Sequence, residues 1–150
     1  YQECVELVEM LGLKDVITFT GRVNMLDFFP NLDIIVLTSI SEAQPLVILE
    51  ANAAGIPVVA SDVGSCRELL EGRSEADKEL GPSGVVSRVS DPGDTAEGII
   101  KILYDQRLWQ MMSDAGRQRT EKYYQEKDLV QKYRKLYRHF ISQPDINNHK

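Results

Sequence analysis

The sequence predicts an α/β fold with a parallel sheet, flanking helices and two further helices at the carboxyl end. Over the first two-thirds of the 150-residue chain, short β-branched runs alternate with segments of helical periodicity. Strands separated by helices need crossover connections, and such connections place the strands parallel in one sheet. After residue 105 the strand-like runs stop, and two charged segments with apolar residues at three- and four-residue intervals follow.

The first part of the chain alternates helix and strand. We expect a helix over 3–13, a strand over 16–21, a short helix or turn over 25–32, and a strand over 33–39. Gly12 stops the helix, and Pro30 would interrupt anything longer than a turn or two in its segment. The run "DIIVLTS" at 33–39 is continuously apolar, which is typical of a strand buried on both faces.

The next helix has clear start and stop signals. Pro45 suits a first helical position, Gly55 suits the exit, and Pro57 prevents continuation, so the helix spans roughly Pro45 to Ala54. The elements expected after it are a strand over 56–61, a helix over 65–72, a polar loop over 73–84, a strand over 85–90, a helix within 91–105 that Asp94 caps, helices over 107–124 and 126–142, and a tail over 143–150.

Charge and cysteine content narrow the function classes. A net charge of -6 and a pI near 4.9 argue against a nucleic-acid or anionic-membrane surface. Cys4 and Cys66 are too few for a disulfide framework or a zinc site, and no apolar run approaches the roughly 20 residues of a membrane helix. We therefore expect a cytoplasmic protein.

Because the sequence opens on Tyr1 inside a helical pattern, we also expect a piece of a longer chain.

Glu50 is an unusual residue for its helix. Its neighbours three and four residues away are all apolar: Leu46, Val47, Ala53 and Ala54. Burying a carboxylate without partners costs several kcal/mol. Glu50 therefore lies either on a narrow solvent stripe or in a pocket that supplies hydroxyl groups or other donors.

Glu42 lies in the loop between the strand at 33–39 and this helix. Open α/β sheets bind ligands at the carboxyl ends of their strands. The helix start just beyond offers unpaired amides and the positive end of a dipole, which suit a diphosphate. Glu42 and Glu50 would then bracket an anion site. Spacing alone leaves a solvated Glu50 and an incidental Glu42 as an equal alternative.

Polar residues also follow the strand at 56–61. Asp62 and Ser65 are placed to line a ligand site, although capping of the local loop is the preferred interpretation. Cys66 stands beside Arg67, which suggests a lowered thiol pKa, but nothing nearby completes a nucleophilic triad. We therefore expect Cys66 to take no part in chemistry.

The segment "SEAQPLVILEANAAGIPVVASDVGSCREL" resembles the signature of retaining, nucleotide-sugar-dependent glycosyltransferases of family four, with the two-glutamate motif at Glu42 and Glu50. The similarity continues through "VITFTGRV", "DIIVLTS" and "GVVSRVSDP" and covers essentially the whole chain. Within that family, the character of "SEAQPLVILEA" and "DVGSCRELLEGRSEADKELGPSG" is closest to the enzymes that polymerise the Pel-type bacterial exopolysaccharide. The resemblance implies the carboxyl-terminal half of a GT-B fold, with a Rossmann-like donor domain over 1–105, packed helices over 106–142 and a tail over 143–150.

The resemblance also implies roles for single residues. Glu42 would contact the donor hexose and support the charge that develops at its anomeric carbon, and Glu50 would bind the ribose hydroxyls. The remaining donor-binding residues would act mostly through their backbones: Ala43, Gln44, Pro45, Leu46 and Val47 on sugar and phosphate, and Gly21, Arg22 and Val23 on the base. Because Pro45 has no N–H, Gln44, Leu46 and Val47 would do the donating. The family often has Gly and an aromatic residue at positions 43 and 44, so the preferred sugar stays open.

The implied reaction is transfer of a hexose from a UDP-sugar, with retention, to a growing polysaccharide or lipid-linked glycan. It needs no metal or other cofactor, because protein donors and cations offset the leaving-group charge. An amino-terminal domain would hold the acceptor, and an Arg and Lys pair before the first helix would bind the diphosphate, so this fragment alone is expected to be inactive. Membrane-associated synthase subunits are expected partners. Two alternatives stay open: a non-catalytic nucleotide-sugar-binding module, and a UDP-sugar epimerase of related architecture.

Overall fold

The computed structural model describes residues 1–141, so the tail predicted over 143–150 lies outside the described residues. The chain divides into two compact units, Tyr1–Pro30 and Asn31–Lys150. The domain boundary predicted at residue 105 stays a prediction.

The first unit holds two of the expected helical segments. α1 (Gln2–Met10) ends just before Gly12, whose φ of 67° is the left-handed conformation that glycine tolerates best. α2 (Met25–Phe28) starts at Asn24, whose side chain accepts a hydrogen bond from the Leu26 amide, and it continues into the 3-10 turn η1 (Phe29–Asn31). The helix and the helix-or-turn predicted in this part are confirmed.

The strand predicted over 16–21 is wrong. These residues form no strand, and Val16 is 76% exposed. A preference for β structure is largely a preference for a pleated, half-buried surface, so it needs a neighbouring strand. Within the described residues, 16–21 have no hydrogen-bonded strand partner. Composition alone therefore does not produce a strand here.

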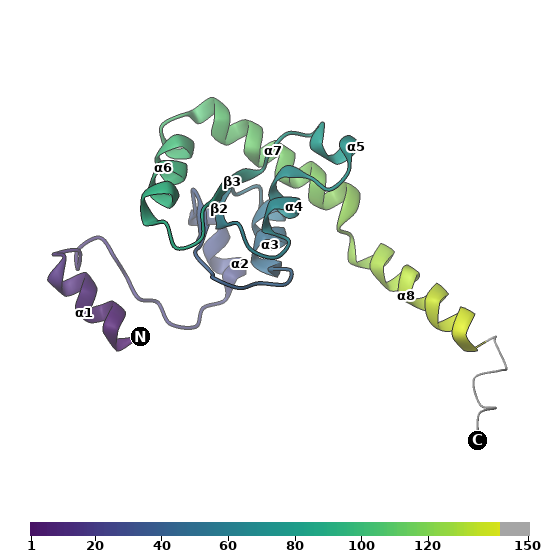
Figure 1. The fold of residues 1–150 in the computed structure, drawn as a ribbon, viewed down its shortest axis with the longest axis horizontal. Coiled ribbons are helices and arrows are strands. Elements are labelled where there is room, and N and C mark those ends of the chain that lie inside the picture. The colour runs from purple at the N-terminus through teal and green to yellow at the C-terminus, as the bar shows by residue number, and fades with distance from the viewer. Residues whose placement is uncertain (142–150) are drawn as a thin grey trace, which may run out of the picture. The chain divides into compact units, whose positions relative to one another are not determined.

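The second unit is built on a parallel sheet, as predicted. Its strands are β1 (Ile35–Leu37), β2 (Val58–Ser61) and β3 (Gly84–Ser87), in the order β1-β2-β3. Ile35 pairs with Val58, and Val58 pairs with Gly84, both in parallel. Figure 1 shows α6 on one side of the sheet and α3 and α4 on the other. The helices of this unit are α3 (Leu46–Ala54), α4 (Cys66–Glu71), α5 (Glu75–Lys78), α6 (Pro92–Leu103), α7 (Gln106–Tyr123) and α8 (Glu126–Ile141).

Two local predictions in this unit need correction. The stretch 73–84, predicted as loop, contains α5, because the Ser74 hydroxyl accepts a hydrogen bond from the Asp77 amide and caps a short turn. The cap of α6 is Asp91 rather than Asp94. The Asp91 side chain accepts from the Asp94 amide at 3.0 Å, and Pro92 then occupies the first helical position.

The core lies around the central strand β2, all four residues of which are buried. Val59, Ile102 and Met112 form a buried cluster that joins β2, α6 and α7. By contrast, Val36 of β1 is 40% exposed. The prediction that 33–39 is buried on both faces is therefore wrong, since β1 is an edge strand of the described sheet.

Arg119 of α7 holds a long connection in place. Its guanidinium is fully buried, pairs with Asp77 Oδ1 at 2.7 Å and also donates to the Asp77 carbonyl. Further donors reach the carbonyls of Leu70 and Gly81 at 2.9 and 2.8 Å and the Ser83 hydroxyl at 3.2 Å. All five N–H groups of a guanidinium thus have acceptors. One side chain therefore fixes the segment that links α4 to β3.

α8 carries the amphipathic pattern predicted for the carboxyl end, but it buries none of its residues. Three of its apolar side chains, Leu129, Tyr133 and Phe140, are each about half exposed, at 52–54%. No helix within residues 1–141 is long and apolar enough to cross a bilayer.

Candidate functional site

Two loops leave the same edge of the sheet and pack against each other. The loop after β1 carries Glu42, and the loop after β2 carries Gly64, whose φ is 52°. A Cβ at Gly64 would lie 2.1 Å from the Glu42 carbonyl oxygen and 2.8 Å from that of Ala43. The Ser65 amide donates to the Ala43 carbonyl at 3.0 Å. Only glycine fits this approach, which fixes the backbone at Glu42 from one side.

The side chain of Glu42 is held by Ser39. The Ser39 hydroxyl donates to Glu42 Oε1 at 2.8 Å, and both residues are half-buried. Among the described residues, nothing donates to the other carboxylate oxygen, Oε2. Ser39 was not among the residues predicted for the site. The available signal was a hydroxyl three residues before a carboxylate in a loop that follows a strand.

The start of α3 lies immediately after this loop. Pro45 occupies the cap position, with φ -73° and ψ 111°, rather than the first helical position, and no side chain caps the helix. The carboxylates of Asp91 and Asp105, by contrast, cap α6 and α7. The amides of Leu46 and Val47 are therefore left for a ligand, and the helix dipole favours an anion there.

Glu50 lies one turn into α3 and is exposed. The buried residues of α3 are Ile48, Ala51 and Asn52, on another side of the helix. The sequence left open whether Glu50 lies on a narrow solvent-exposed stripe or in a pocket. The structure places it on a solvent-exposed stripe, where Leu46 on the same side is 65% exposed. The Glu50 carboxylate is thus solvated in the free protein, so folding pays no cost for its desolvation. It is also accessible to a ligand.

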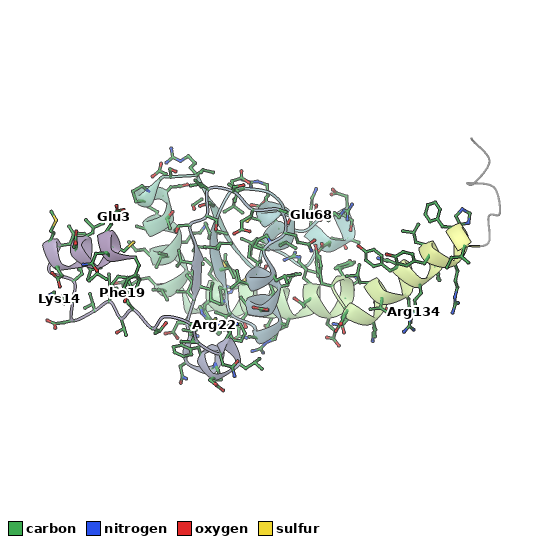
Figure 2. The ribbon with its side chains drawn as sticks, turned by 90° about the horizontal axis from the view of Figure 1, so that it is seen from below. Glu3, Lys14, Phe19, Arg22, Glu68 and Arg134 are labelled. Atoms are coloured by element: carbon green, nitrogen blue, oxygen red, sulfur yellow. The ribbon has the colours of Figure 1, made fainter. Side chains whose placement is uncertain are left out.

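The other predicted donor-binding residues lie in two places. Ala43 and Gln44 are exposed in the Glu42 loop, Pro45 is buried, and Val47 is half-buried. Gly21, Arg22 and Val23 belong to the first unit, on the segment ahead of α2, where Figure 2 labels Arg22. Gly21 has a φ of 65°, and Arg22 is exposed. Their roles stay predictions.

A surface cavity of about 620 Å³ adjoins the Glu42 loop. It is lined by Ala43, Asp62, Gly64, Ser65, Arg67, Glu68, Gly72 and Arg73. The capping role preferred for Asp62 and Ser65 is wrong. The Asp62 carboxylate pairs with Arg67 at 2.8 Å, and the Ser65 side chain makes no capping hydrogen bond to α4. Glu68 of α4, which Figure 2 labels, is another of the residues that line this cavity.

Cys66 does not have the lowered thiol pKa that its neighbour suggested. The thiol is buried, and loss of solvation raises its pKa. Arg67 cannot offset this effect because its guanidinium is already paired with Asp62 and Glu71.

Within residues 1–141, no group of three or more His, Cys, Asp or Glu residues is placed to hold a metal ion.

The contact at Gly64 predicts a stability effect. Gly64→Ala is expected to lower the free energy of unfolding by about 1–3 kcal/mol more than Gly81→Ala does. Both glycines have positive φ, at 52° and 82°, but a Cβ at Gly81 meets nothing within 4 Å. Urea unfolding of both variants in the full-length protein measures the difference. Equal destabilisation would contradict the role given to the contact with Glu42.

The fold and the site together define a class of protein. An acidic residue is fixed at the carboxyl edge of a parallel sheet, beside a helix start with free amides and an accessible second carboxylate. A helix start with free amides at the carboxyl edge of a parallel sheet is typical of α/β domains that bind phosphate-containing ligands.

The family model for Glycosyl transferases group 1 matches residues 1–119, and the chain belongs to this family. A curated relative, N-acetyl-alpha-D-glucosaminyl L-malate synthase of Bacillus anthracis, is 27% identical over 134 residues, which are 89% of this chain and 33% of the relative. The chain therefore spans about a third of that protein's length.

Solved structures agree on the fold. Sucrose-phosphate synthase from Thermosynechococcus elongatus superposes with a TM-score of 0.82 at 24% identity, over 93% of this chain and 34% of that one. Anabaena HepE in complex with UDP superposes with a TM-score of 0.79 at 20% identity, over 91% of this chain and 36% of that one. HepE has also been solved with UDP-glucose. The predicted α/β fold, that of one half of a GT-B glycosyltransferase, is confirmed.

Proposed function

We propose that this chain is the nucleotide-sugar donor-binding domain of a retaining glycosyltransferase that transfers a hexose from a UDP-sugar to a growing polysaccharide. One observation carries the proposal. Glu42 is held at the carboxyl edge of the sheet directly before the uncapped start of α3, and Glu50 is accessible one turn further on. The choice of UDP is supported by HepE, which binds UDP and UDP-glucose.

In this proposal, the hexose, the phosphates and the ribose of a UDP-sugar are each contacted by a different group of the protein. The anionic Glu42 faces the hexose and stabilises the positive charge that develops at the anomeric carbon as the leaving group departs. The amides of Gln44, Leu46 and Val47 bind sugar and phosphate oxygens at the positive end of α3. Glu50 accepts hydrogen bonds from the ribose hydroxyls, which are donors that an exposed carboxylate can reach.

The remaining parts of the proposal rest on the resemblance. Gly21, Arg22 and Val23 would line the base, and the leaving diphosphate would need no metal. The acceptor, a polysaccharide or lipid-linked glycan, would be bound by parts of the full-length protein outside this chain. The similarity of residues 41–51 and 62–84 to the Pel-type enzymes supports a cytoplasmic exopolysaccharide synthase that works with membrane-associated partners.

Glu50→Gln tests the nucleotide site. The change is expected to weaken binding of free UDP by roughly 10- to 100-fold, because hydrogen bonds from the ribose hydroxyls to a charged acceptor become bonds to a neutral one. Calorimetric titration of the full-length protein with UDP, and with GDP and ADP for comparison, measures the effect.

Glu97→Gln is the matched control for this titration. Glu97 is also an exposed helical glutamate of the second unit, and no hydrogen bond or ion pair involves it within the described chain. The control should bind UDP as the wild type does. A Glu50→Gln protein that keeps full UDP affinity would contradict the nucleotide site proposed for α3.

A further inference from the structure

We propose that Ser39 is a positioning residue for Glu42: its hydroxyl holds the carboxylate in the orientation that sugar transfer requires. The inference rests on the function proposed for Glu42 and adds a residue to that site. It is based on the hydrogen bond from Ser39 Oγ to Glu42 Oε1, at 2.8 Å.

The Glu42 side chain needs such a partner. Glu42 lies in the connection between β1 and α3, in neither a helix nor a strand. A glutamate side chain has three rotatable bonds, and ordering it costs conformational entropy. Ser39 is its sole side-chain donor among the described residues. A short hydrogen bond to one oxygen therefore selects one orientation of the carboxylate.

The backbone of the same residue is held from the opposite loop. Gly64 lies against the Glu42 carbonyl so closely that a Cβ there would come within 2.1 Å of it. The Ser65 amide bonds to the next carbonyl, that of Ala43, at 3.0 Å. The loop after β2 thus sets where Glu42 stands, and Ser39 sets where its carboxylate points.

This division leaves one carboxylate oxygen for the donor. Oε1 is occupied by the Ser39 hydroxyl, while Oε2 accepts no hydrogen bond from the described residues. A hexose hydroxyl or the developing positive charge can therefore interact with Oε2 without displacing Ser39. Without the hydroxyl, Glu42 would keep its charge and its backbone position but sample several orientations.

Ser39→Ala in the full-length protein tests the inference. The turnover number for release of UDP from the UDP-sugar that the wild type turns over fastest is expected to fall by about 10- to 100-fold, the size of effect that a misplaced catalytic group produces. The Kd for free UDP should stay at its wild-type value, because UDP carries no hexose. The melting temperature should fall only slightly, because a single hydrogen bond between half-buried groups is lost. Ser39→Thr keeps the hydroxyl and should restore most of the turnover.

Ser41→Ala is the matched control. Ser41 lies in the same loop, is exposed, and makes no hydrogen bond within the described chain. Its variant should turn over as the wild type does.

The possible outcomes separate this inference from the proposed function. Wild-type turnover in Ser39→Ala would overturn the inference alone. Parallel loss of turnover and UDP affinity in Ser39→Ala, without rescue by threonine, would show that Ser39 only supports the loop and would also overturn it. A wild-type protein that binds no UDP and releases none from UDP-glucose, UDP-galactose or UDP-N-acetylglucosamine would overturn the proposed function, and the inference with it.

Discussion

Glu42→Ala is expected to lower the turnover number of sugar transfer by about 10²- to 10³-fold in the full-length protein. The reason is that its carboxylate, held beside Ser39, would stabilise charge that exists only during transfer. Binding of free UDP should change by less than about threefold, because UDP lacks the hexose that Glu42 is proposed to contact. Release of UDP from the preferred UDP-sugar measures turnover, and calorimetry measures the Kd for UDP.

The comparison with Glu50→Gln makes this prediction selective. The Glu50 variant should lose mainly UDP affinity, and the Glu42 variant should lose mainly turnover. Equal losses of both quantities in both variants would therefore contradict the division of roles.

The behaviour of the wild-type protein also decides between the alternative functions. Binding of UDP without any transfer would favour a non-catalytic module, and conversion of a UDP-sugar without an acceptor would favour an epimerase.

Arg119→Met is expected to lower the free energy of unfolding by about 3–5 kcal/mol, the usual cost of removing one partner of a buried ion pair. The change would leave Asp77, which is 2% exposed, as an unpaired buried carboxylate. It would also leave the carbonyls of Leu70 and Gly81 without these donors. Urea or thermal unfolding followed by circular dichroism measures the loss.

Arg117→Met is the control for this prediction. Arg117 is on the same helix but exposed, and it donates to the Ala54 carbonyl at 3.2 Å. Its loss should cost roughly 1 kcal/mol or less. Adding Asp77→Asn to Arg119→Met should recover part of the stability, because the buried charge is removed together with its partner. Similar losses from both arginines would contradict the role given to Arg119.

Local signals made most of the fold predictable. Pro45, Gly55 and Pro57 bracket α3 closely enough that the predicted start differs from the observed one by a single residue. The parallel sheet was predictable because strands and helices alternate along the chain, and each of these elements can be recognised from a short stretch of sequence. The failures needed information from elsewhere in the chain. The strand at 16–21 lacks a described partner strand, and the exposure of Val36 follows from its place at the sheet edge.

The candidate site was predictable in part for the same reason. Glu42 and Glu50 were singled out from their places relative to one strand and one helix. The Gly64 contact joins loops more than 20 positions apart, and Arg119 meets Asp77 across 42 positions, so no short-range pattern indicates either one. Asp91 and Asp94 stand three residues apart at one helix start, and only the backbone geometry shows which of them is the cap.

The contacts of Arg119 have a consequence for which substitutions this chain can accept. Three of its five hydrogen bonds go to backbone carbonyls, those of Leu70, Asp77 and Gly81. Every amino acid supplies a carbonyl, so these bonds recognise the path of the chain rather than the identity of its residues. Between α4 and β3, substitutions can therefore accumulate at most exposed positions while Arg119, Asp77 and Ser83 keep the path the same. This connection contributes Gly72 and Arg73 to the cavity beside the Glu42 loop, so the surface chemistry there can change without rebuilding the fold.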